Sequence, residues 1–348
     1  MRIRGVGIET LILIAAGVAI FFVVLLLSNA FQTFEWAQVA VYFIAIVGLN
    51  VLTGYSGQIS LGNGAFMALG GYTTALLYAR FHFPEYASIP VAGILAGVGG
   101  FLFGIPALRL RGIYLALATF ALALAVTPLA NHYDAFTGGH VGLHLAFIAP
   151  PPGVDVVFSS SQWLFILDSA IALIMFIPAA LLVSSKTGRA WTAIRDSEAA
   201  AVASGVNVPY YKTLAFAISA FYAGVAGSLQ VIGLSYVNPD NYGLGLSLAL
   251  LVGLVVGGLA SRWGPLFGAA LVIWLPNFAE GVARIRIGSL TLEKPDVFYG
   301  ALLLVIVFFA PGGVAGLVNR ALAWYRSRRR AVTEEVEVAP SVLEEPLG

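Results

Sequence analysis

The polar residues with the clearest capacity for chemistry lie in one short stretch, NVLTGYSGQISLGN, which runs from Asn50 to Asn63. Gln58, Ser60 and Asn63 offer amide and hydroxyl groups that can both donate and accept hydrogen bonds. Gly57 stands among them, and glycine readily interrupts a regular helix. Because an apolar run lies on either side, we expect these groups to hydrogen-bond either a neighbouring segment or a ligand.

A second polar stretch, SSKTGRAWTAIRDSEAAAVASGVNVPYYK, occupies residues 184–212 between two long apolar runs. Its many alanines predict helix from about residue 187 to residue 204, and Gly205 suits the end of that helix. Asp196 or Ser197 can cap a second short helix, so we expect two helical pieces that meet near Arg195.

The predicted helical stretch has one face of its own. Trp191, Ile194 and Ala201 fall on it at helical spacing, and small alanines would let that face approach another protein closely. Arg189, Arg195, Asp196 and Glu198 would then supply polar contacts around it. Two interpretations remain open from the residues alone: a connector lying on a membrane surface, or a helix that docks in a groove on a partner.

The sequence gives little support for disulfides, metal sites, nucleotide binding or catalysis in this chain. The chain has no Cys, which excludes disulfides and thiolate metal sites. It has no GxxxxGK[ST] motif, so we expect no nucleotide-binding loop and no cofactor bound by this chain. His140 and His144 have a metal-ligand spacing, but Gly142 between them disfavours a helix, so we expect solvated loop histidines and no metal. We find no catalytic constellation and predict that the chain is not an enzyme.

The composition indicates a membrane protein. Charged residues make up 10% of the 348 residues, against about 25% in soluble domains, and 59% of the residues are hydrophobic. The net charge of +1 indicates no affinity for nucleic acid. We therefore expect a bilayer, and contact with lipid, around much of the surface.

Apolar runs of roughly 17–25 residues predict membrane spans, so we expect an all-α polytopic membrane protein with about ten transmembrane helices. Placing the N-terminus in the cytoplasm puts all but four of the 18 lysines and arginines inside, which predicts that both termini are cytoplasmic. The candidate spans are about 8–27, 34–53, 60–79, 88–107, 112–130, 163–183, 211–232, 243–260, 264–281 and 296–318.

These spans divide the chain into a transmembrane domain over residues 1–320, with residues 184–212 as a cytoplasmic loop inside it, and a tail over residues 321–348. The tail is acidic and has little to bury, so we expect disorder. The outer loop at residues 131–162 is long enough to suggest a function. Asp168, in the sixth span, is interpreted as an outer interfacial carboxylate that reaches water or bonds Ser169 or a neighbouring helix.

Inside a membrane, the glycine-broken stretch has a specific meaning. Unwound backbone is tolerated there only where it lines a cavity or is buried in protein, and transporters place binding groups at such breaks. We therefore predict that Asn50, Gly57, Gln58, Ser60 and Asn63 line a translocation path. Helix packing through glycine, with Gln58 bonding a neighbour's carbonyl, is the alternative. A helix–helix hydrogen bond also explains Asn50.

Several motifs carry a family resemblance. They are the stretch from Asn50 to Leu77, RLRGIYLALATFALA, TGGHVGL, GGLASRWGPLFGA, FFAPGGVAGL and the Glu-Ala-Ala pattern that begins at Glu198. Over residues 35 to 320 the chain resembles the branched-chain amino acid (LIV-type) permeases of ATP-binding-cassette (ABC) importers, and in particular the longer of their two partner permeases. It departs from the family at Asn63-Gly64 and at His140, which puts the exact solute in doubt.

The resemblance implies a function and a set of partners. The chain would form the pathway for leucine, isoleucine and valine across the bacterial inner membrane, with urea, short amides or other amino acids as alternative solutes. A second homologous permease, two ATPase subunits that bind the ATP, and a periplasmic binding protein would complete the importer. A stand-alone ion-coupled transporter is the alternative of a different class. The resemblance assigns coupling to the ATPase to Arg189, Trp191, Ile194, Arg195, Asp196, Glu198, Ala200, Ala201 and Gly205.

Overall fold

The computed structural model describes residues 2–3, 6–7, 21–110, 112–145, 150, 158–283 and 313–316. Its long helices are α2 (Ala30–Leu49), α3 (Asn63–Phe81), α4 (Glu85–Ala107), α5 (Ile113–His132), α7 (Ser160–Ser184), α10 (Val208–Leu234), α11 (Leu244–Gly257) and α12 (Gly264–Ala283). The short elements are the π-helix η1 (Asn50–Tyr55), α6 (Asp134–Thr137), α8 (Lys186–Asp196), α9 (Glu198–Ala203) and the 3-10 helix η2 (Pro239–Tyr242).

Two small antiparallel ribbons complete the described structure. Strand β1 (Arg2–Ile3) pairs with β2 (Val6–Gly7), and β3 (Leu143–His144) pairs with β4 (Tyr236–Val237). In the second ribbon, Leu143 faces Val237 and His144 faces Tyr236. This ribbon ties the beginning of the predicted outer loop to the chain that leaves α10.

The all-helical membrane architecture is confirmed. Within the described residues, six helical segments are long and apolar enough to cross a membrane: Ala30–Tyr55, Glu85–Ala107, Ile113–His132, Ser160–Ser184, Val208–Leu234 and Pro239–Gly257. The eight predicted spans between residues 34 and 281 each coincide with a long helix. Most of the span at 8–27, nearly all of the span at 296–318 and the whole tail at 321–348 lie outside the described residues, so the count of ten and the side of both termini stay predictions.

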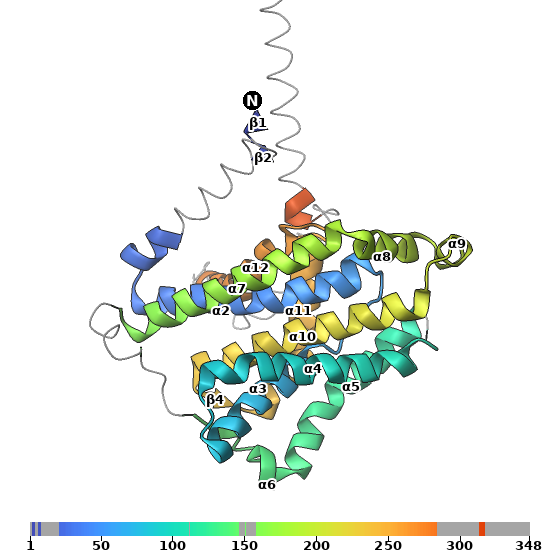
Figure 1. Ribbon diagram of the computed structural model, residues 1–348. Helices are drawn as coiled ribbons and strands as arrows, with labels where there is room; N and C mark the ends of the chain where they lie inside the picture. Colours follow the sequence, from blue (N-terminus) through green and yellow to red (C-terminus); the bar gives the residue numbers. More distant parts are fainter. Residues whose placement is uncertain are drawn as a thin grey trace, which may run out of the picture.

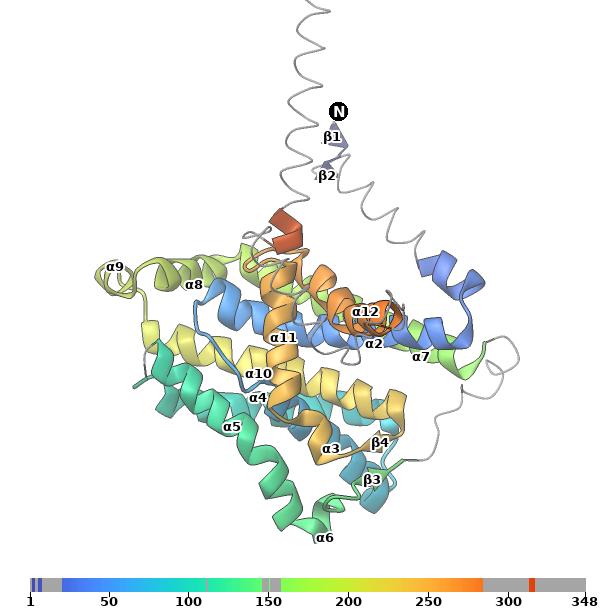
Figure 2. The ribbon, with the colours of Figure 1, turned by 180° about the vertical axis from the view of Figure 1, so that it is seen from behind.

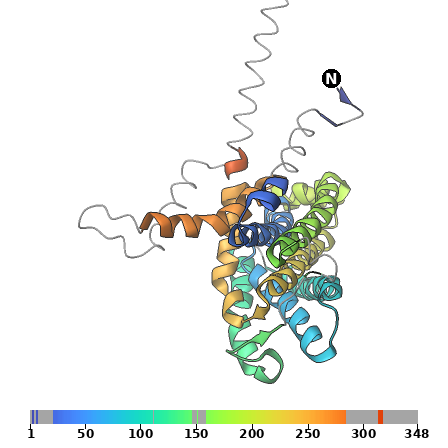
Figure 3. The same ribbon diagram turned by 90° about the vertical axis from the view of Figure 1, so that its left-hand side faces the viewer.

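The long helices form a bundle with a central layer and an outer layer. Helices α2, α4, α7 and α10 run side by side (Figure 1), and Figure 3 views several of them end-on. The central segments Ala30–Tyr55 and Val208–Leu234 are each 83% buried, whereas the outer helices α5 and α7 are only 22% and 17% buried. Helix α11 runs steeply across the direction of α2 and α10 (Figure 2). Apolar residues lie on every side of these helices, so a single apolar face does not decide which helices are central. Helices with small residues can approach one another closely, and these pack at the centre.

Glycines allow the closest approach, between α3 and α10. A Cβ atom added at Gly227 of α10 would overlap the backbone carbonyl of Met67 in α3, and one added at Gly70 of α3 would overlap the backbone at Gly224 of α10. Because backbone meets backbone here, no side chain can rotate away to make room. This contact fixes α3 in the centre of the bundle.

We expect Gly227→Val to prevent normal packing of α3 on α10, because the added methyl groups have no space. Overpacking of a core generally destabilises by about 1–3 kcal/mol or more. Gly245→Val in α11 is the matched control, since a Cβ there meets no atom within 4 Å. Thermal unfolding of the purified variants in detergent measures the difference. Equal midpoints for the two variants would show that the α3–α10 contact is less tight than described.

Candidate functional site

The second membrane segment is broken inside the bundle. Helix α2 continues into the π-helix η1, and the chain then turns at Gly57, whose φ is +73°, before α3 begins at Asn63. The side chain of Asn63 donates from Nδ2 to the carbonyl oxygen of Ala45 in α2 at 3.4 Å, and its Oδ1 accepts from Ser219 Oγ of α10 at 3.2 Å. Since Ala45 and Ser219 lie well inside their own helices, α3 starts in the interior of the bundle and not at its surface.

The unwound stretch finds hydrogen-bond partners on several surrounding helices. Thr119 Oγ1 of α5 accepts from the amide of Leu61 at 2.9 Å, and Ser247 Oγ of α11 accepts from the amide of Gly64 at 2.9 Å. Ser60 Oγ accepts from the amide of Gly62 at 3.3 Å. Buried polar groups that are paired in this way can remain within a bilayer. The structure therefore brings Gln58, Ser60 and Asn63 together at the break, while their role in solute passage stays a prediction.

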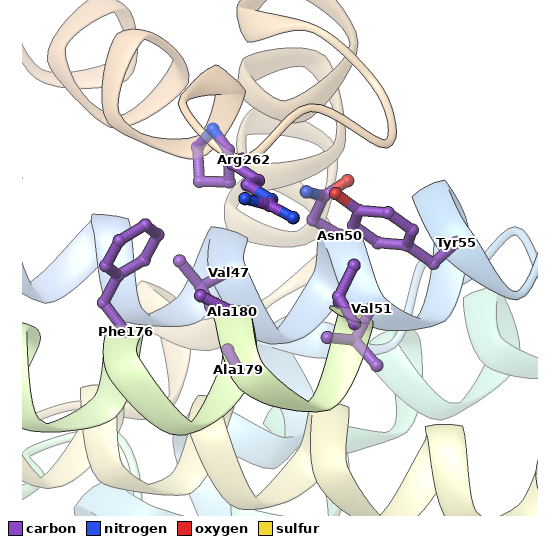
Figure 4. Close-up of a pocket in the computed structure, with 10 residues that line it drawn as sticks. Val47, Asn50, Val51, Tyr55, Phe176, Ala179, Ala180 and Arg262 are labelled. Atoms are coloured by element: carbon purple, nitrogen blue, oxygen red, sulfur yellow. The ribbon is translucent and has the colours of Figure 1, made fainter. Parts of the chain in front are cut away.

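Asn50 lies apart from that group and joins distant segments. Its Oδ1 accepts from the amide of Ala260 at 2.9 Å, and its Nδ2 donates to the carbonyl oxygen of Ser261 at 2.8 Å. Asn50 therefore bonds the turn between α11 and α12 and not another helix, and its predicted place on the translocation path stays a prediction. A small pocket beside it is lined by Tyr55 and Arg262 together with apolar side chains of α2 and α7 (Figure 4).

The polar stretch at residues 184–212 forms the two predicted helices. Ser185 caps α8 by accepting from the amide of Thr187 at 3.1 Å, and Ser197 caps α9 by accepting from the amide of Ala200 at 3.3 Å. The predicted break next to Arg195 is thereby confirmed. The chain then leaves α9 through Gly205, whose φ of +79° favours glycine.

One face of this helix pair packs against the chain itself. Trp191 is fully buried among residues of η1, α4, α5 and α10, and its Nε1 donates to the carbonyl oxygen of Tyr211 at 2.8 Å. Ile194 and Ala201 are buried together with Val208. From the sequence, we expected this face to approach another protein. In the structure it packs against other helices of the same chain. These three residues therefore position the two helices.

The opposite face is open. Arg189, Asp196, Ala200 and Gly205 are exposed, as is Val202, which is 59% accessible. Helix α9 lies at one extremity of the molecule (Figures 1 and 2). We call the exposed residues Ala199, Ala200, Val202, Ala203 and Gly205 the docking face.

The helix pair is bonded directly to the broken segment. Arg195 donates from Nη1 to the carbonyl oxygen of Gly54 in η1 at 3.1 Å, and its Nε and Nη2 donate to Asp196 Oδ1 at 3.2 and 3.1 Å. A Cβ atom at Gly57 would lie 2.7 Å from Arg195 Cγ, so the two chains touch there. Sequence reasoning missed this bond because Arg195 and Gly54 are 141 residues apart and no local pattern joins them.

A second connection runs through α10. Gln58 Nε2 donates to Ser56 Oγ at 2.6 Å and, at 3.4 Å, to the carbonyl oxygen of Lys212. Lys212 Nζ in turn forms an ion pair with Glu198 Oε2 of α9 at 2.8 Å. Residues on both sides of the junction between α8 and α9 are thus linked to residues 54–58.

Asp168 and His144 lie away from both the broken segment and the helix pair. Asp168 is 1% accessible, and neither of its carboxylate oxygens has a hydrogen-bond partner among the described residues. The interpretation that it reaches water or bonds Ser169 is therefore wrong, because α7 turns this side chain inward. His144 packs on the ring of Tyr236, and no group of three metal-ligating side chains occurs in the described part of the chain.

Comparison with known proteins places this arrangement in a family. The sequence profile described as "Branched-chain amino acid transport system / permease component" matches residues 34–310. The high-affinity branched-chain amino acid transport system permease protein LivM of Escherichia coli is 34% identical over 304 residues, which cover 81% of this chain and 69% of that protein. LivM of Salmonella typhimurium is 31% identical over 305 residues, with the same two coverages.

A more distant relative transports a different kind of solute. The ribose import permease protein RbsC of Haemophilus influenzae is 26% identical over 247 residues, which cover 69% of this chain and 74% of that protein. No solved structure matches the chain. With a profile that spans most of its length and two LivM relatives above 30% identity, the chain belongs to the family of permease components of branched-chain amino acid transport systems.

Proposed function

We propose that the chain forms the translocation pathway of an ABC importer that carries leucine, isoleucine and valine across the bacterial inner membrane. The family and the two LivM relatives support the solute class. Relatives named LivH, which are 22–23% identical, support pairing with a second homologous permease. The complete importer would add two ATPase subunits, which bind and hydrolyse the ATP, and a periplasmic binding protein.

The docking face is the proposed binding site of an ATPase subunit. It consists of small residues around the single larger side chain of Val202, and charged residues border it at Arg189 and Asp196. Small exposed residues on a short helix fit closely into a groove on a partner. This role places α8, α9 and both chain termini on the cytoplasmic side. The loop after α5, which begins with α6 and β3, would then face the periplasmic binding protein.

The observation that carries the proposal is the bond from Arg195 to Gly54. Movement of α9 by a closing ATPase would reach η1 through Arg195 and would reach Gln58 through Lys212. The exposed docking face and the broken span are therefore two ends of one connected structure. Coupling requires that the ATPase bind the two conformations of the permease with different affinity. The two bonds provide the physical means by which such a difference reaches the pathway.

Reconstituted uptake tests the proposal as a whole. We expect proteoliposomes that contain the complete importer to accumulate radiolabelled leucine only with ATP and the binding protein. Accumulation of leucine against a gradient by this chain alone would contradict the proposal and would favour the ion-coupled alternative. Competition by urea, short amides and ribose in the same assay tests the solute class.

We expect Ala199→Trp to abolish docking of the ATPase, because the indole ring would occupy the surface of α9. Loss of a well-packed interface contact costs about 2 kcal/mol or more, which corresponds to at least a roughly tenfold loss of uptake. Ala121→Trp, on the exposed side of α5, is the matched control. Co-purification of the ATPase with each variant gives the readout. Normal co-purification with Ala199→Trp would exclude this face as the ATPase seat.

We expect Arg195→Ala to separate ATP hydrolysis from transport, because it removes the guanidinium that joins α8 to Gly54. A hydrogen bond from a charged group contributes about 1.5–3 kcal/mol, so leucine uptake per ATP hydrolysed should fall by about tenfold or more. Arg262→Ala is the control, since it removes a guanidinium that bonds Ser184 and leaves the bond from Arg195 to Gly54 in place. If the two variants show equal uptake per ATP, the bond does not transmit the motion.

A further inference from the structure

A second group of polar side chains is buried in the half of α2 and α10 that lies farther from α8 and α9. Two glutamines, Gln38 of α2 and Gln230 of α10, are 8% and 6% accessible. Tyr72 of α3 is 8% accessible and Tyr242 of η2 is 1% accessible. Tyr42 of α2 is partly buried. We call these five residues the amide–phenol cluster.

Contacts between α2 and α10 bring Gln38, Tyr42 and Gln230 together. Gln230 Nε2 donates to Tyr42 Oη at 3.4 Å. Gln38, one helical turn before Tyr42, has its Nε2 3.3 Å from the place that a Cβ atom at Gly233 would take. The hydroxyl of Tyr242 lies 3.0 Å from the corresponding place at Gly71, the residue before Tyr72. The contacts join α2 to α10 and η2 to α3, and glycine at positions 71 and 233 leaves room for the polar ends.

The cluster has hydrogen-bonding capacity that the protein does not use. Gln38 Nε2, Gln230 Oε1 and the hydroxyl of Tyr72 are buried without a partner among the described residues. Most buried polar atoms in proteins are paired, so each exception needs a cause. The break at residues 56–62 shows the contrast, because Gln58, Ser60 and Asn63 have partners there. A free donor and a free acceptor on facing helices match a ligand that carries both kinds of group.

The charge of the cluster restricts the ligand. None of the five side chains is ionised near neutral pH, since amides do not titrate and tyrosine has an ordinary pKa of about 10. A ligand with net charge would be buried here without an opposite charge, which is strongly unfavourable. The two charged groups of a neutral amino acid also lose their hydration here, but the charges attract each other and each can pair with one of the amides. A neutral amino acid has an ammonium group for Gln230 Oε1 and a carboxylate for Gln38 Nε2.

We propose that the amide–phenol cluster is a solute site in the pathway, and that Gln38 and Gln230 bind the carboxylate and the ammonium group of a neutral amino acid as it passes. This inference rests on the proposed function, which supplies the solute class. In the structure the helices pack together around the cluster, and Gln38 Nε2 and Gln230 Oε1 are left without partners among the described residues.

Gln38→Leu and Gln230→Leu test the proposal in the reconstituted importer with radiolabelled leucine at saturating binding protein. We expect leucine uptake to fall by about tenfold in each variant, which is the effect of one lost hydrogen bond to a charged group. We expect ATP hydrolysis stimulated by the loaded binding protein to continue, because α8 and α9 are unchanged. Gln32→Leu is the control: Gln32 is exposed and, among the described residues, its side chain accepts only the capping bond from the amide of Asn29, so this variant should transport at nearly the wild-type rate.

Thermal unfolding separates a binding role from a structural one. Gln38→Leu replaces an amide whose Nε2 is unpartnered among the described residues, so its unfolding midpoint should be unchanged or higher. Gln230→Leu also loses the bond to Tyr42, so a small fall of its midpoint is expected. Wild-type uptake in both glutamine variants would overturn the site, and so would a lower midpoint accompanied by an equal loss of uptake and ATP hydrolysis. Failure of the wild-type importer to take up leucine would instead contradict the proposed function itself.

Discussion

The structure depends on one constraint: the backbone groups released where the second membrane segment unwinds must be paired inside the protein. Lipid offers no hydrogen bonds, and an unpaired amide or carbonyl in that environment costs several kcal/mol. The partners come from residues far away in the chain, including Thr119, Arg195 and Ser247. These hydrogen bonds therefore stabilise the break, and they also fix the positions of α5, α8 and α11 relative to it.

This constraint explains why α8 and α9 are integral parts of the bundle. Trp191 fills a space between η1, α4, α5 and α10, and Arg195 reaches from the same helix to the carbonyl of Gly54. The free side of α9 carries small exposed residues, whereas that of α8 carries the exposed Arg189 and Asp196. A partner that binds there acts on a helix pair whose other side is bonded to the broken span. Because guanidinium–carbonyl bonds are directional, rotation of α8 changes the bond at η1 without requiring movement of the whole bundle.

Two polar regions at different depths have opposite character. At the break, the side chains of Gln58, Ser60 and Asn63 are bonded to protein atoms, so this region is stable as it stands. In the amide–phenol cluster, atoms of Gln38 and Gln230 lack partners among the described residues. Full pairing favours a structural joint, whereas unused donors and acceptors favour a site that is completed by a ligand. The two regions differ in whether their polar atoms have hydrogen-bond partners, and not in how polar their residues are.

Local features were predictable from the sequence because their causes are local. Long apolar runs must form helices in a bilayer, so the spans between residues 34 and 281 were located to within a few residues. Glycine next to polar residues indicated the break at Gly57, and Ser197 before an alanine run indicated the start of α9. The family motifs could also be recognised in the sequence, and the profile match over residues 34–310 confirmed the family.

The tertiary structure decided which side of each helix faces inward. A soluble helix reveals its buried side by its apolar residues, but a membrane helix is apolar all round, so periodicity is uninformative. That is why the sequence placed Asp168 near water although it is buried. In the polar helix α8, periodicity did identify the apolar face of Trp191 and Ile194, but only the folded chain shows that this face packs inside the same protein. The bonds from Arg195 to Gly54 and from Asn50 to the turn at Ser261 join residues 141 and 211 positions apart, so only the folded chain brings them together.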